Sequence, residues 1–96
     1  KKDVSGRLEI IDHELINKFD QSFGNRIVTQ TIDFAGVFTN AGGSLTDALD
    51  YQISSKILRK VISSDDSDAL RDLRELMKDY PRSVYLIDKR IKELEL

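Results

Sequence analysis

The chain has 96 residues, 40% hydrophobic and 33% charged, a composition that fits one globular domain and excludes an extended disordered segment. Its 15 Lys and Arg against 17 Asp and Glu give a net charge of -2, which excludes a broad positive field for nucleic acid or an anionic membrane but leaves room for a local basic patch. The chain has no cysteine, and no apolar run approaches the about 20 residues that span a bilayer, so we expect no disulfide, no thiolate metal site and no membrane partner. A cytoplasmic location is compatible with this composition.

The first segment predicts a lead-in followed by a helix. Residues 7–11 alternate between charged and apolar side chains, which is typical of a short edge strand or of the approach to a helix. Asp12 is a candidate N-cap for a helix. The apolar positions of that helix are Leu15, Ile16, Phe19 and Phe23. Gly24 is expected to end it, because glycine readily adopts a positive φ.

Two helices are expected in the middle of the chain. Asn25 is a candidate cap for the first, with apolar positions at Ile27, Val28, Ile32, Ala35 and Phe38. Residues 40–43 break this pattern. Ser44 and Asp47 then resemble a capping box, with Asp in place of the preferred Glu. The helix after it has apolar positions at Leu45, Ala48, Leu49, Ile53, Ile57, Leu58 and Val61.

The C-terminal third predicts two more helices. The polar residues 63–67 separate them from the preceding helix and supply aspartates suited to a helix N-terminus. The first has apolar positions at Leu70, Leu73, Met77 and Tyr80, and Pro81 is well placed to begin the last one. The last has Val84, Ile87, Ile91 and Leu94. The sequence therefore predicts one all-α domain over residues 1–96. It comprises a lead-in over residues 1–11 and a bundle of four to five helices over residues 12–96, with one short N-terminal edge strand as an option.

The chain has few groups that could carry out catalysis. His13 is the only histidine, so a histidine-based metal cluster cannot form, and a histidine in the first turn of a helix is usually solvated. Asp65, Asp66 and Asp68 lack the glycine and the distal glutamate of a calcium loop and are better explained as helix-capping residues. Gly42 is not part of a phosphate-binding loop, because no Lys follows it. We expect no catalytic residue, metal site or cofactor within this chain.

Three segments resemble the helical lid of AAA+ ATPases. Residues 23–28, Phe-Gly-Asn-Arg-Ile-Val, resemble its sensor-arginine helix. Residues 45–60 resemble the Leu-x-x-Ala-Leu-Asp-x-Gln-Ile-x-x-Lys-Ile-Leu-Pro-Lys helix of the branch typified by methylcytosine-specific restriction motors. Residues 80–83, Tyr-Pro-Arg-Ser, resemble the end of that lid. Arg59 departs from the pattern, since the family has Pro there, and the third helix is therefore free to continue past Leu58.

This resemblance implies a lid beside a nucleotide-binding core that precedes it. The core would hold ATP or GTP with Mg²⁺, and the parent protein would assemble as a homo-oligomeric ring. By position, Arg26 corresponds to the arginine that senses the phosphates, with Asn25 beside it. A guanidinium near a helix N-terminus suits that task, whereas the alternative is a surface ion pair with Asp20. Asp47 and Asp50 fit capping or lid-to-core contacts.

A second group of cations follows in the third helix. Lys56 and Lys60 are four residues apart, with Arg59 beside them, and they are candidates for contact with a neighbouring subunit's nucleotide or with nucleic acid. The alternative is a solvated helix face, which the lack of interleaved aromatic residues favours. Tyr51 and Tyr85 fit either an interface or the core.

Two other functions compete with the lid. A free-standing interaction module would use an exposed stripe on the last helix, formed by Val84, Ile87, Ile91 and Leu94. A small DNA-binding domain is disfavoured by the acidic balance. A lid without its core is expected to expose an apolar face around the start of the second helix. The termini, with Lys and not Met at the start, suggest a fragment, although a processed protein would look the same.

Overall fold

The computed structural model describes residues 2–95, which form an elongated bundle of five α-helices measuring 43 × 23 × 17 Å. The helices are α1 (Lys2–Phe19), α2 (Asn25–Asn40), α3 (Leu45–Gln52), α4 (Ser67–Leu76) and α5 (Pro81–Leu94). Two further turns, η1 (Ile53–Ile57) and η2 (Leu58–Lys60), continue α3. The described residues contain no strand, so the all-α prediction is confirmed and the optional edge strand is absent.

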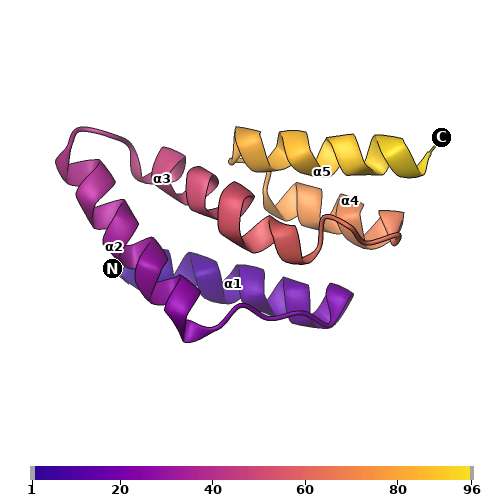
Figure 1. Cartoon of the computed structure of the whole chain (residues 1–96), viewed down its shortest axis with the longest axis horizontal. Helices are drawn as coiled ribbons and strands as arrows, with labels where there is room; N and C mark the ends of the chain where they lie inside the picture. Colours follow the sequence, from indigo (N-terminus) through magenta and orange to yellow (C-terminus); the bar gives the residue numbers. More distant parts are fainter. Residues whose placement is uncertain (1, 96) are drawn as a thin grey trace.

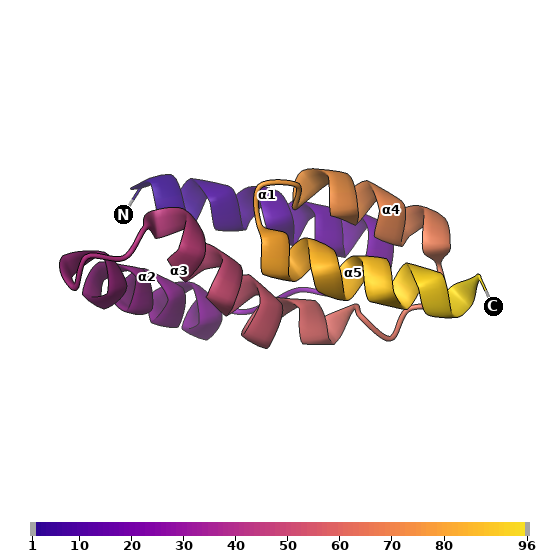
Figure 2. The same ribbon diagram turned by 90° about the horizontal axis from the view of Figure 1, so that it is seen from above.

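Three helix pairs that are neighbours in the chain pack together, α1 on α2, α2 on α3 and α4 on α5, while α3 also packs on α5 and α1 on α4. In Figure 1, α3 lies between the pair α1–α2 and the pair α4–α5. Figure 2 shows α1 and α4 along one side of the bundle, with α2 and α3 along the other. The contact between α1 and α4 joins the two ends of the chain.

The first helix begins earlier than the sequence predicts. Residues 7–11 lie inside α1, which starts at Lys2, so the lead-in over residues 1–11 and the N-cap role of Asp12 were both wrong. The buried face of α1 consists of Val4, Leu8, Ile11 and Leu15, at spacings of four, three and four. Ile16, predicted as part of that face, is exposed.

The connection from α1 to α2 is closed by polar groups other than those predicted. Asp20 adopts the positive φ of 55° that ends α1, whereas Gly24 is extended, with φ of -79°, and serves as the N-cap of α2. Asn25 is therefore the first residue of α2 and not its cap. The Asp12 carboxylate accepts hydrogen bonds from Ser22 Oγ and from the backbone N–H of Phe23, whose ring is buried. Asp12 thus caps this connection and not a helix.

The third helix starts as predicted and then changes its winding. The Ser44 hydroxyl accepts a hydrogen bond from the N–H of Asp47 at 3.0 Å, which confirms Ser44 as the N-cap. Past Gln52 the chain continues as a π turn, in which the N–H of Leu58 donates to the carbonyl of Ile53, five residues back. The hydroxyls of Ser54 and Ser55 both donate to the Tyr51 carbonyl, a local contact of the kind that bends helices. The helix thus runs past Leu58 to Lys60, the outcome that Arg59 in place of Pro allows.

The last two helices begin where the sequence predicts. Asp66 is the N-cap of α4 and accepts from the N–H of Ala69 at 3.0 Å, and Pro81 is the first residue of α5. Ile87 and Ile91, which the interaction-module hypothesis needs on the surface, are 0% and 8% exposed. That hypothesis was wrong about this stripe, because it faces the core.

Ion pairs join helices that are distant in the sequence. Lys18, near the end of α1, donates to Asp72 of α4 at 2.8 Å, and this hydrogen bond together with the charge of Asp72 raises the pKa of Lys18. Arg74 pairs with Asp88 between α4 and α5, and that hydrogen bond and charge raise the pKa of Arg74. These pairs are exposed, so they fix the alignment of the helices more than they add to stability.

The core is built from apolar side chains of every helix. Its fully buried members include Leu8, Leu15, Leu49, Ile53, Ile57, Leu58, Val61, Leu70, Leu73, Met77 and Ile87. None of the helices formed by residues 2–95 is long and apolar enough to cross a membrane.

The core assignment can be tested with one substitution made at two positions. Val61→Ala, at a site 2% exposed, should lower the free energy of unfolding by about 1.5–3 kcal/mol, because the removed methyl groups are fully buried. Val37→Ala, at a site 71% exposed, should change it by less than about 0.5 kcal/mol. Urea titrations of both variants would measure this, and equal effects would contradict the assigned core.

Candidate functional site

Arg26 and Asn25 lie in the first turn of α2, and both side chains are exposed. The N–H groups of Ile27 and Val28 donate to the Gly24 carbonyl. Within residues 2–95, the N–H groups of Asn25 and Arg26 have no acceptor, and the Arg26 guanidinium has no acidic partner, Asp20 included. The start of α2 therefore combines free donors, the positive end of a helix dipole and a guanidinium, which together suit an anion.

The surface around this turn is more polar than expected for a lid separated from its core. Ile27 and Val28 are only half-buried, and Phe23 is buried beneath the connection. The large apolar side chains that are exposed in the described chain lie elsewhere: Ile10, Ile16, Val37, Tyr51 and Tyr85. The prediction of an exposed apolar face at the start of α2 was therefore wrong.

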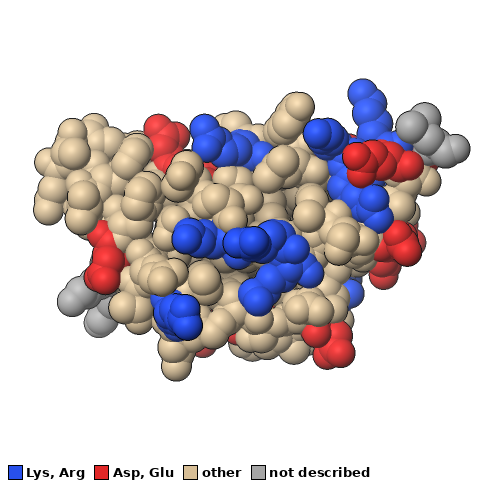
Figure 3. Space-filling view, viewed as in Figure 1, with Lys and Arg blue, Asp and Glu red and all other residues tan. Residues whose placement is uncertain are grey.

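Lys56, Arg59 and Lys60 lie on η1 and η2, and all three are exposed. No carboxylate of residues 2–95 pairs with them. Figure 3 shows Lys and Arg side chains gathered across the middle of the face that α3 and α5 present, with Asp and Glu toward its edges. These three cations are on a different element from Arg26.

A cluster that the sequence did not predict in full joins α3 to α5. The buried carboxylate of Asp50 accepts three hydrogen bonds from the start of α5, donated by the N–H of Arg82 at 2.8 Å, the N–H of Ser83 at 2.9 Å and the hydroxyl of Ser83 at 2.7 Å. Tyr80, the N-cap of α5, supplies no side-chain acceptor. Asp50 of α3 thus caps the start of α5. The sequence does not predict this role, because Asp50 lies 32 residues before Arg82.

Planar side chains stack beside this cap. The ring centroid of Phe34 is 5.6 Å from that of Phe38 and 5.4 Å from that of Tyr51, and the Arg82 guanidinium is 5.5 Å from the Tyr51 centroid. Phe38 also covers Gly43, where an added Cβ would lie 2.1 Å from the ring, so a larger residue there would force the Phe38 side chain to shift. A cleft of about 470 Å³ lies along the stack. Because Phe34 and Arg82 both contact the Tyr51 ring, this stack links α2, α3 and α5.

Tyr51 and Tyr85 are 46% and 65% exposed, so neither belongs to the core. Whether they contact another molecule stays a prediction. Tyr51 already makes two contacts within the chain, with Phe34 and Arg82, which account for its position.

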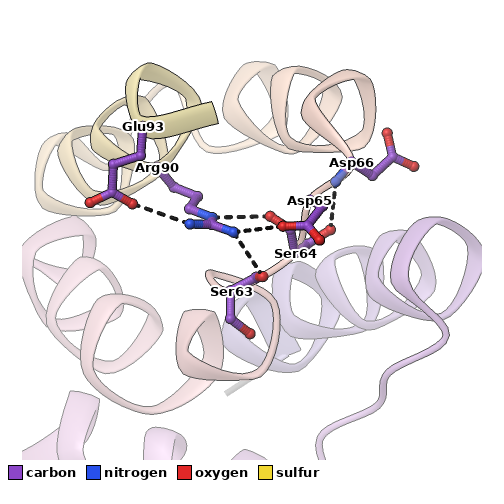
Figure 4. A network of polar contacts seen from close by, with 6 residues as sticks. All are labelled: Ser63, Ser64, Asp65, Asp66, Arg90 and Glu93. Carbon is purple, nitrogen blue, oxygen red and sulfur yellow. Dashed lines mark hydrogen bonds and ion pairs between the residues drawn. The ribbon is translucent and has the colours of Figure 1, made fainter. Parts of the chain in front are cut away.

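Arg90 of α5 holds the connection between η2 and α4, as Figure 4 shows. Its guanidinium donates to the carbonyls of Ser63 and Ser64, each at 3.0 Å, and to the Asp65 carboxylate at 2.9 Å. Glu93 contacts the same guanidinium. Two carbonyls of the connection between η2 and α4 are satisfied in this way, so the network has a structural role.

The remaining sequence candidates do not form a site. His13 is exposed and lies in the middle of α1, not in its first turn. Asp65 is held by Arg90 and Asp66 caps α4, while Asp68 contacts Arg71 at 3.9 Å. Across residues 2–95, no group of three or more His, Asp or Glu side chains is placed to hold a metal ion.

The whole chain, residues 1–96, matches a family described as a domain of unknown function, DUF8727. The chain belongs to this family. No curated protein and no solved structure matches it. The family description states no activity, so a function has to be argued from the residues themselves.

The inter-helix cap predicts a clear difference between two aspartates of α3. Asp50→Asn should lower the free energy of unfolding by about 1.5–3 kcal/mol, since it removes charge-assisted hydrogen bonds from buried donors. Asp47→Asn, an exposed carboxylate in the first turn of the same helix, should cost less than about 1 kcal/mol. Thermal and urea unfolding would measure both variants, and an Asp50→Asn cost no larger than that of Asp47→Asn would refute the cap.

Proposed function

We propose that this chain is the helical lid of an AAA+ nucleotide-driven motor and that Arg26 senses the nucleotide phosphates. The observation that carries the proposal is the start of α2, where an exposed guanidinium without an acidic partner in residues 2–95 stands beside two open backbone N–H groups. Such a group can stabilise negative charge on a phosphoryl group during transfer. The resemblance of residues 23–28 and 45–60 to that lid places Arg26 at the corresponding position.

The packing suits a part that moves as one body. Asp50 ties α3 to α5, Arg74 ties α4 to α5, and Lys18 ties α1 to α4, all around one core. A lid of this kind would carry Arg26 toward or away from a nucleotide as the motor opens and closes. Contacts that join the helices in this way are what motion as a single body requires.

The other parts of the proposal concern molecules beyond this chain. An N-terminal nucleotide-binding core would hold the substrate, ATP or GTP with Mg²⁺, and would carry out the hydrolysis. The parent protein would act in the cytoplasm as a homo-oligomeric ring. Lys56, Arg59 and Lys60 lie on η1 and η2, whereas Arg26 lies on α2.

A second candidate, a helical protein–protein interaction module, is favoured by one observation. Ile10 and Ile16 are exposed on α1, and Ile10 lines a hollow of about 530 Å³ together with Met77 and Tyr80. Exposed apolar side chains beside a hollow are typical of a contact surface. This surface would replace the last-helix stripe that the structure buries.

The lid proposal is tested in the parent protein, where the core is present. Arg26→Ala should lower the rate of ATP or GTP hydrolysis, each assayed separately, by at least about 100-fold, because the charge on the transferring phosphoryl group loses its guanidinium partner. Nucleotide binding, measured by fluorescent-analogue titration, should be retained.

Arg71→Ala is the matched control, because Arg71 is also exposed but is paired with Glu95. It should leave turnover within about twofold of the parent, in line with the small effect of exposed pairs. A parent that hydrolyses neither nucleotide, or an Arg26→Ala variant with full turnover, would favour the interaction module.

A further inference from the structure

The outer side of η1 and η2 carries a basic strip, defined here as Lys56, Arg59 and Lys60. All three side chains are exposed, and none has an acidic partner among the residues that the structure describes. Four cations outside the strip are neutralised, since Lys18, Arg71, Arg74 and Arg90 each pair with Asp or Glu. The strip is therefore uncompensated charge within a chain whose net charge is -2.

The π turn is what brings the strip to the surface. Residues seven apart share one face of an α-helix, so Lys56 and Lys60 would fall on the same side as the buried Leu49 and Ile53 if α3 continued regularly. The bond from the Leu58 N–H to the Ile53 carbonyl inserts one extra residue into the turn.

The extra residue shifts which positions face the core. The core side of the segment passes to Ile57, Leu58 and Val61, all buried, and both lysines turn outward. The π turn thus keeps Lys56 and Lys60 out of the core. Turns of this kind occur frequently at functional sites.

The surroundings of the strip add charge and polar groups. Figure 3 shows Lys and Arg running across the middle of this face while the acidic side chains lie toward its edges. Beyond Lys60 the surface falls into a hollow of about 620 Å³ that is lined by the polar Asn17, Gln21 and Ser63 and also by the acidic Asp20 and the exposed Ile16. Amides and hydroxyls there can donate to phosphate and sugar oxygens.

We propose that the basic strip binds the phosphodiester backbone of a nucleic acid without reading its sequence. Two ammonium groups and one guanidinium fork are the groups that bind phosphate oxygens in such contacts. Residues 53–60 expose no large apolar side chain, whereas a membrane surface or a protein interface would use one as an anchor. The inference goes beyond the lid function and does not depend on it, since Arg26 is not in the strip.

The proposal predicts salt-dependent binding, measured by fluorescence anisotropy of short labelled oligonucleotides. With three phosphate contacts, the logarithm of the association constant should fall against the logarithm of salt with a slope of about -2 for single strands and about -3 for duplex. Labelled single-stranded DNA, duplex DNA and single-stranded RNA distinguish the sources of the phosphodiester backbone.

The decisive variant is Lys56→Gln/Lys60→Gln. It should reduce the magnitude of the slope by about 1 for each lysine removed and weaken binding at low salt by at least about fivefold. Lys78→Gln/Lys92→Gln removes the same charge from exposed positions outside the strip and should keep the slope of the original chain. Circular dichroism verifies the fold of each variant, and Arg59→Gln provides an independent loss of about one unit of slope.

Three results would overturn the proposal. The first is no binding of any oligonucleotide at about 50 mM salt. The second is an equal loss of binding affinity in the two double variants, which would indicate that binding depends on the net charge of the chain and not on the strip. The third is strip-dependent binding to phosphatidylserine vesicles or to polyglutamate without binding to nucleic acid. None of these results bears on Arg26, which is tested by hydrolysis.

Discussion

The arrangement of the bundle depends on the carboxylate of Asp50. The start of α5 is buried at Ser83, and a helix start exposes N–H groups that its own turns cannot satisfy. Pro81 removes one donor, and Asp50 accepts from Arg82 N–H, Ser83 N–H and the Ser83 hydroxyl. Because the acceptor belongs to α3, α5 can satisfy its first turn only when it packs in one place.

The remaining contacts follow from that placement. With α5 fixed, Arg74 can reach Asp88 and align α4, and Arg90 can reach two carbonyls of the connection between η2 and α4. Lys18 then joins α1 to Asp72 of α4 and closes the bundle. The lid proposal also needs α2, which carries Arg26, to move with the other helices, and α2 packs on α3 with Phe34 stacked on Tyr51.

The change of winding after α3 lets one segment bury its apolar residues and expose its lysines. The apolar residues Leu49, Ile53, Ile57 and Val61 repeat every four residues, which is slower than the 3.6-residue period of an α-helix. A regular helix would drift off this pattern within three turns. The π turn adds one residue to a turn and so restores the match between the four-residue spacing and the helix. The apolar residues stay buried, and the lysines of the basic strip stay exposed.

The sequence by itself determined the features that depend on neighbours within about four residues along the chain. Apolar spacing gave the number and order of the helices, while Ser44, Asp66 and Pro81 marked helix starts, because each acts on its own helix. The exposure of Arg26 and of the strip also agrees with their polar character. A local pattern was misleading in α1, where the outward Ile10 and Ile16 interrupt the true face formed by Val4, Leu8, Ile11 and Leu15.

Only the tertiary structure decided the contacts that join residues far apart in the chain. Asp50 reaches Ser83 across 33 positions and Arg90 reaches Asp65 across 25, and neither pairing has a sequence spacing that would reveal it. The same holds for Asp12 in α1, whose carboxylate accepts a hydrogen bond from the N–H of Phe23 in the connection that follows the helix. A buried donor must find an acceptor wherever the fold brings one. Tertiary packing therefore decides which acceptor is used, whereas the need for an acceptor can be predicted from the sequence.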